Sequence, residues 1–169
     1  PKVWHFGLGF KNKFLIHLKK ETKKEFIWSF SGNINNKSRR IFANTFQNLK
    51  PFFFRSLSSF NSKEGLKIKE YCQIMSKSYF AICPQGFVNN ESFRFYEALL
   101  SGAIPVCLKS DTLYSYYPSY WHAIFPNEKL PIIVGKDWNE CLFKMQFLIN
   151  NTKDLEKTIR DCELFTKNI

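Results

Sequence analysis

The chain has 169 residues, of which 44% are hydrophobic and 18% aromatic, and its formal net charge is +11 at pH 7. This length is enough for a core without disulfide or metal support, and the 19 Phe residues exclude an intrinsically disordered chain. No apolar run is long enough to span a membrane. We therefore expect one globular domain. Because the chain begins at Pro1 within ordinary sequence, we also expect it to be a piece of a longer protein.

Basic side chains are concentrated in the first part of the chain. Residues 1–50 contain 11 Lys and Arg against 2 Asp and Glu, whereas the remainder contains 14 against 12. Such a surface can bind nucleic acid, an acidic surface or a phosphorylated small molecule, but it can equally be a solvated Lys-rich surface. The five cysteines show no Cys/His spacing typical of zinc, and Cys83 and Cys107 lie in apolar runs that predict burial.

The elements alternate between strands and helices from residue 26 onward. Residues 1–25 mix aromatics with Lys and are interpreted as an irregular lead-in or the remnant of a preceding domain. A first strand at 26–30 ends in a Gly loop, and Ser38 can cap the helix that follows. Further strands are predicted at 52–56, 79–83, 104–108 and 131–134. Further helices are predicted at 63–77, at 91–101 (closed by Gly102) and over 137–167, with an irregular segment at 111–126.

Short apolar strands that alternate with helices predict an α/β fold with a parallel sheet covered on both faces. Ligands of such folds bind beyond the carboxyl ends of the strands, where loops lead into helix N-termini. Residues 31–40 and 84–97 occupy those loops in this sequence. They are therefore the segments in which we expect a binding site.

The loop and helix at 84–102 carry the strongest candidates for chemistry. Arg94 and Glu97 are three residues apart and share a helix face, while Phe93, Tyr96 and Leu100 form the stripe expected to pack on the sheet. A guanidinium in the crevice suits a phosphate, and a carboxylate one turn deeper suits the hydroxyls of a ribose. The alternative is a surface ion pair that contributes less than about 1 kcal/mol.

The same segment resembles a known family. Residues 79–86 and 92–106 follow the exostosin-like glycosyltransferase pattern: Pro-x-Gly, then Ser-x-Arg-x-x-Glu-Ala, then Gly-x-Ile-Pro-Val. The resemblance extends over roughly residues 26–134, since Gly32 and the following arginines are similar to the family's upstream glycine loop. It implies that residues 26–169 form a Rossmann-like nucleotide-sugar-binding domain, the C-terminal half of a GT-B enzyme. Such an enzyme transfers a sugar with inversion and without a metal.

Carried over by position, the resemblance implies a set of donor-binding residues. Glu97 would bind the ribose of a nucleotide sugar, such as a UDP-sugar, and Arg94, Ser92 and the helix N-terminus would hold its diphosphate. Gly32 would admit the phosphates, and Arg39 or Arg40 would add positive charge. The complete donor-binding set is Gly32, Arg39, Arg40, Gln85, Gly86, Asn90, Ser92, Arg94 and Glu97.

The resemblance leaves other parts of the enzyme outside the chain. The sequence contains no Asp-x-Asp pair, so a metal-bound diphosphate is disfavoured and no metal or cofactor is expected. The acceptor would be a glycan, a glycoconjugate or another hydroxyl compound. The general base is expected on a preceding domain, because His5, His17 and His122 are better explained as surface or packing residues, and Asp111 as a turn residue.

Two alternatives remain at the level of sequence. One is a non-catalytic domain that binds nucleotides or polyanions; the other, a nucleic-acid-binding module, has only the charge in its favour and no recognised motif. Sequons at Asn36 and Asn90 fall in the predicted phosphate loops, where a glycan would block the site. This favours a cytoplasmic bacterial or viral enzyme, with a Golgi enzyme as the alternative. Any membrane attachment would lie outside this chain.

Overall fold

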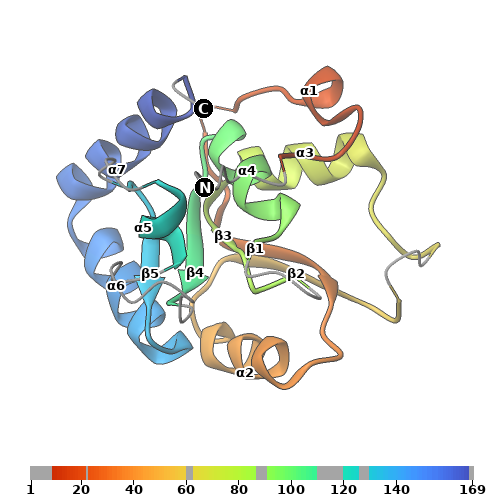
Figure 1. The fold of residues 1–169 in the computed structure, drawn as a ribbon, viewed down its shortest axis with the longest axis horizontal. Helices are drawn as coiled ribbons and strands as arrows, with labels where there is room; N and C mark the ends of the chain where they lie inside the picture. The colour runs from red at the N-terminus through yellow and green to blue at the C-terminus, as the bar shows by residue number, and fades with distance from the viewer. Residues whose placement is uncertain are drawn as a thin grey trace, which may run out of the picture.

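A computed structural model describes residues 9–21, 23–59, 63–86, 91–109, 120–125 and 130–167. At its centre lies a five-stranded sheet in the order β2-β1-β3-β4-β5, in which all neighbouring strands are parallel (Figure 1). The strands are β1 (Phe26–Asn33), β2 (Phe52–Leu57), β3 (Ser78–Ile82), β4 (Ile104–Leu108) and β5 (Ile133–Gly135). The predicted α/β, Rossmann-like fold is confirmed.

Helices cover both faces of the sheet. In Figure 1, α2 lies below the sheet and α3 and α4 lie above it. Helix α6 contacts α2 on one face, and α7 contacts both α6 and α4 at the β5 end. The helices are α1 (Phe14–His17), α2 (Lys37–Phe46), α3 (Ile68–Ser76), α4 (Phe93–Leu100), α5 (Tyr120–Ile124), α6 (Trp138–Asn150) and α7 (Thr152–Phe165).

Aromatic side chains fill the space between the sheet and the α2/α6 layer. Trp28 of β1 stacks on Phe52 of β2 with ring centroids 4.7 Å apart, and Phe42 of α2 meets the Trp138 ring of α6 at 5.4 Å. The Trp138 indole Nε1 also donates a hydrogen bond of 3.0 Å to the Ser38 hydroxyl. Large rings contribute much of the buried apolar surface, and Phe30, Phe42 and Phe46 are buried in this layer.

The structure differs from the predictions in two short helices and in the residue that caps α2. The segment at 9–21 contains the one-turn helix α1, and α5 lies in a segment predicted to be irregular. Asn36, not Ser38, caps α2, because its side-chain oxygen accepts from the Arg39 backbone N–H at 2.8 Å. Gly102 does adopt the left-handed conformation expected after a helix, with φ of 68°.

The cysteines are buried, as the apolar runs around Cys83 and Cys107 predicted. All five are free thiols. Burial raises the pKa of Cys72 to about 11 and the pKa values of Cys141 and Cys162 to about 12. Among the residues that the structure describes, no helix is both long and apolar enough to cross a bilayer.

A half-buried lysine links two helix ends before the start of β1, at the end of the strand opposite the predicted site. Lys24 Nζ donates to the carbonyl of Ser76, the last residue of α3, at 2.7 Å and to the carbonyl of Gly102, just after α4, at 2.8 Å. Burial lowers the pKa of Lys24 to about 8, although Glu163 acts in the opposite direction. Lys24 is therefore neutral in the folded chain and charged in the unfolded chain between pH 8 and 10.5.

We expect the free energy of unfolding to rise through this pH window, because the unfolded state then binds more protons than the folded state. The Lys24 contribution amounts to about 3 kcal/mol, since one pKa unit corresponds to about 1.4 kcal/mol. Urea denaturation of wild type and Lys24→Met at pH 7.5 and pH 10 measures the Lys24 contribution. The variant should lack this contribution, while Lys153→Met, a control on the exposed side of α7, should retain it. Identical pH dependence in wild type and Lys24→Met would contradict the expectation.

Candidate functional site

The strand order places a topological switch point between β1 and β3. The chain moves from β1 to β2 on one side and then returns to β3 on the other, so its direction across the sheet reverses between these two strands. In open α/β sheets, ligands bind beyond the carboxyl ends of the strands at such a switch point. Here those ends are residues 31–33 of β1 and the loop 83–86 that follows β3.

Arg94 projects from the first turn of α4 onto the end of β1. Its Nη2 donates to the Ser31 carbonyl at 2.8 Å, and its guanidinium carbon lies 4.6 Å from the centroid of the Phe30 ring. A guanidinium over an aromatic face gains a cation–π attraction. Arg94 is thus held at the switch point by one hydrogen bond and one ring.

Arg39 joins the two strand ends from the other side. Its Nη1 donates to the Asn33 carbonyl at 2.9 Å and its Nη2 to the Gln85 carbonyl at 2.7 Å. Burial, followed by the charge of Arg94, lowers the pKa of the Arg39 guanidinium. Neither guanidinium forms an ion pair with a carboxylate in the described part of the chain. Two adjacent cations without a counter-charge make this edge suitable for an anion.

Three buried polar atoms of Arg39, Ser92 and Arg94 have no hydrogen-bond partner among the residues that the structure describes: Arg39 Nε, Ser92 Oγ and Arg94 Nε. Leaving a buried donor or acceptor unsatisfied costs about 1–3 kcal/mol, so such atoms are few in native proteins. Ser92 is the N-cap residue of α4, yet its side chain makes no capping bond. All three residues belong to the predicted donor-binding set, and an oxygen-rich ligand could satisfy them.

The structure separates the remaining predicted residues. Arg40 is exposed and donates to the Asn35 carbonyl at 3.0 Å, so of the two candidate arginines Arg39 is the one beside Arg94. Gly32 is buried beside the Arg94 guanidinium. Gln85 is exposed and Gly86 is half-buried in the same loop. Asn90 lies outside the described residues, as do His5, Asp111 and the tyrosines at 114–117; the His122 side chain is likewise not described.

Glu97 differs from expectation because it is completely buried rather than facing the crevice. Its Oε2 accepts from the Tyr71 hydroxyl at 2.7 Å, and its Oε1 accepts from the Lys11 backbone N–H at 3.2 Å. Burial, together with Glu97, raises the pKa of Tyr71 well above its ordinary value. The physical reason is that α4 is covered by α3 and by the segment before β1. A ribose-binding role for Glu97 stays a prediction.

The packing stripe of α4 is also rotated from the predicted one. Phe93 is 37% exposed, whereas Phe95 and Leu99 are fully buried. Sequence reasoning missed a second buried carboxylate, Glu91, which is 2% exposed and accepts from the Tyr120 hydroxyl at 2.8 Å. Nothing in the sequence indicated this burial, because Glu91 begins the helix predicted at 91–101 and acidic residues are mostly exposed. Trp121 is core, stacked on Phe95 at 4.3 Å.

Comparison with known proteins gives a family. Residues 9–165 match the family described as the RXYLT1 C-terminal domain. The chain belongs to this family. The RXYLT1 C-terminal domain is part of a glycosyltransferase, and this membership implies binding of a sugar donor and acceptor in general terms. No curated protein and no solved structure matches the chain.

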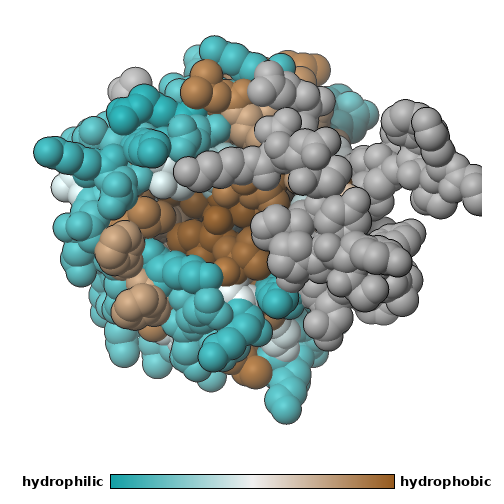
Figure 2. Space-filling model, turned by 60° about the vertical axis from the view of Figure 1, so that its left-hand side comes forward, coloured by the Kyte–Doolittle hydropathy of each residue, from teal (hydrophilic) through white to brown (hydrophobic). Residues whose placement is uncertain are grey.

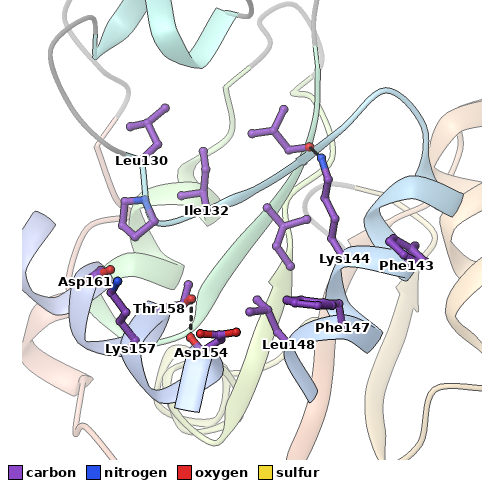
Figure 3. A pocket seen from close by; sticks show the side chains of 13 residues that line it. Leu130, Ile132, Phe143, Lys144, Phe147, Leu148, Asp154, Lys157, Thr158 and Asp161 are labelled. Atoms are coloured by element: carbon purple, nitrogen blue, oxygen red, sulfur yellow. Dashed lines mark hydrogen bonds between the residues drawn. The ribbon is translucent and has the colours of Figure 1, made fainter. Parts of the chain in front are cut away.

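This RXYLT1 C-terminal domain also has a hollow that lies apart from the arginine site. It has a volume of about 710 Å³ and lies between β5, α6 and α7. Figure 2 shows hydrophobic residues gathered on the face that carries these elements, and Figure 3 shows Ile132, Phe147 and Leu148 around the hollow. Phe143 beside it is 68% exposed. None of the predicted donor-binding residues lines this hollow.

Possible metal ligands are not gathered at either place. Across the described ranges, no three His, Cys, Asp or Glu side chains come together in the way that a metal ion requires. At the ends of β1 and β3, the RXYLT1 C-terminal domain brings together the guanidinium groups of Arg39 and Arg94.

Proposed function

We propose that the chain is the donor-binding domain of an exostosin-like, GT-B glycosyltransferase. The diphosphate of a nucleoside-diphosphate sugar would bind beyond the carboxyl ends of β1 and β3. One observation carries the proposal. Arg39 and Arg94 reach the ends of β3 and β1, Ser92 begins α4, and each holds a buried polar atom that has no partner among the described residues. Membership in a glycosyltransferase family supports a sugar donor over other anions.

The chemistry of transfer explains why cations are needed there. When the bond between sugar and diphosphate oxygen breaks, the leaving nucleoside diphosphate gains negative charge. Fixed guanidinium groups next to that charge stabilise the transition state without reorganisation, which is the role that a metal ion plays in other enzymes. We therefore propose inverting, metal-independent transfer to a glycan or other hydroxyl acceptor, with the general base supplied from outside this chain.

A binding experiment can identify the class of nucleotide donor. The family is named after a ribitol xylosyltransferase, so a UDP-pentose belongs in any panel of donors beside UDP-hexoses and other nucleoside diphosphates. In a thermal-shift screen, UDP at 100 times its dissociation constant adds about 2.7 kcal/mol to stability. At equal concentration, UDP should stabilise the chain more than uridine, which lacks the phosphates. Equal shifts with UDP and uridine would contradict a diphosphate site.

Ser92→Ala is expected to separate stability from binding. Removing an unsatisfied buried hydroxyl should raise the free energy of unfolding of the ligand-free chain by about 1 kcal/mol, because no capping bond is lost. The same change should weaken UDP binding at least about tenfold, since one hydrogen bond to a charged group, about 1.5 kcal/mol or more, is removed. Urea denaturation and isothermal titration calorimetry measure the two effects. A Ser92→Ala chain that is both less stable and unchanged in UDP affinity would assign the hydroxyl to folding alone.

A non-catalytic nucleotide- or polyanion-binding domain is the second candidate. The observation in its favour is the enclosed Glu97, whose two oxygens are already engaged by Tyr71 and Lys11. The two candidates differ in turnover. Hydrolysis or transfer from a UDP-sugar by the longer protein that carries this domain supports the enzyme. Binding without either reaction, or displacement of UDP by a polysulfated glycan, supports the alternative.

A further inference from the structure

We infer that Gly32 is a positioning residue for Arg94, because only a residue without a side chain leaves room for the guanidinium at the end of β1. This inference rests on the proposed function, in which Arg94 holds the diphosphate. The resemblance implied that Gly32 leaves room for the phosphates themselves. In the present inference, Gly32 instead leaves room for Arg94, and Arg94 contacts the phosphates.

The space beside Gly32 is already filled. A Cβ placed on Gly32 would lie 2.8 Å from Arg94 Nη2 and 3.1 Å from Phe30 Cζ. Real Cβ atoms essentially never come within 3.0 Å of another heavy atom. Gly32 pairs with Ser56 in the regular ladder between β1 and β2, and its φ lies outside the left-handed region. The backbone conformation at this position would therefore accept any residue. Glycine is needed because a side chain would collide with the Arg94 guanidinium.

Two residues just before Gly32 in β1, Phe30 and Ser31, hold Arg94 in place. Its Nη2 is fixed by the Ser31 carbonyl, immediately before Gly32, and its flat face lies over the Phe30 ring. An added methyl group would push Nη2 away from this carbonyl. Because Nη2 is the far end of a flexible side chain, the guanidinium can yield while the strand keeps its place. The expected result of Gly32→Ala is a folded chain with a displaced Arg94.

A double-mutant cycle with UDP as the probe and uridine as the phosphate-free control tests this. Gly32→Ala should weaken UDP binding about tenfold to hundredfold, the loss expected for a misplaced charge-assisted hydrogen bond. Uridine binding should not change. In the Arg94→Ala background, Gly32→Ala should cause no further loss of UDP affinity. Full UDP affinity in Gly32→Ala, or losses that add completely in the double variant, would overturn the inference.

A second cycle needs no ligand. Gly32→Ala should lower the melting temperature less in the Arg94→Ala background than in wild type, because the crowded Nη2 is then absent. Gly135→Ala is a matched control at the end of β5, where the new Cβ would lie 2.6 Å from Cys141 Sγ. Its cost should be the same in both backgrounds. If wild type does not bind UDP, the proposed function fails, but equal costs of Gly32→Ala in the two backgrounds would overturn the role of Gly32 independently.

Discussion

Arg94→Ala is expected to weaken UDP binding about a hundredfold, the largest effect of any single substitution at the arginine site. The change removes a charged donor whose Nε is buried without a partner, and hydrogen bonds from charged groups contribute about 1.5–3 kcal/mol. Arg94→Lys should recover part of this loss, because it restores the charge but not the planar fork that stacks on Phe30. Isothermal titration calorimetry at two salt concentrations measures both effects.

The matched control is Arg160→Ala on α7. Arg160 is also cationic, but its side chain is 64% exposed and lies 3.9 Å from Glu156. Arg160→Ala should leave UDP affinity unchanged, although it alters the net charge by the same amount as Arg94→Ala. If Arg94→Ala and Arg160→Ala weaken UDP binding equally, the effect is one of net charge, and the ligand is not at the switch point.

Glu97→Ala is expected to lower the free energy of unfolding by about 3 kcal/mol. The substitution leaves the Tyr71 hydroxyl and the Lys11 N–H without their acceptor, at about 1–3 kcal/mol for each buried group, and also creates a cavity. Tyr71→Phe should cost about 1–2 kcal/mol, because it removes a single donor. Because Tyr71 and Glu97 share a hydrogen bond, their effects should not add.

Urea denaturation of the two single variants and the double variant measures these costs. The result also distinguishes a structural role of Glu97 from ribose binding. A residue whose only task is to hold a ribose could be replaced with little loss of stability. Unchanged stability in Glu97→Ala together with lost UDP binding would therefore favour the ribose role and would show that the bonds to Tyr71 and Lys11 are weak.

The fold was predictable because its signals are local. Each strand is a short apolar run, and buried parallel strands need no alternation, so runs such as 104–108 stand out in the sequence. Helix α6, which lies in the region predicted to be helical, buries Trp138, Cys141 and Met145 at helical spacing. By contrast, α1 and α5 are helices of four and five residues, too short for a helical period to be seen.

The site was predictable only in part. The motif around Ser92 and Arg94 identified candidate residues but did not show where their side chains point. The choice between Arg39 and Arg40 depends on the rotation of α2, which the sequence does not reveal. The enclosure of Glu97 depends on Lys11, which lies 86 positions earlier in the chain and folds back over α3 and α4. Contacts of this kind arise from tertiary packing and leave no pattern within one segment.

The hydrogen bond between Trp138 and Ser38 connects residues 100 positions apart, and it has a consequence for how this domain can change over time. Helix α6 follows β5, at the opposite end of the sheet from β2, yet its first residue is fixed against the residue that precedes Arg39. A substitution at the start of α6 should therefore change the position of Arg39, which it does not contact. If Arg39 binds the donor as proposed, variation in specificity among related chains should arise at such distant packing positions as well as in the loops at the proposed site.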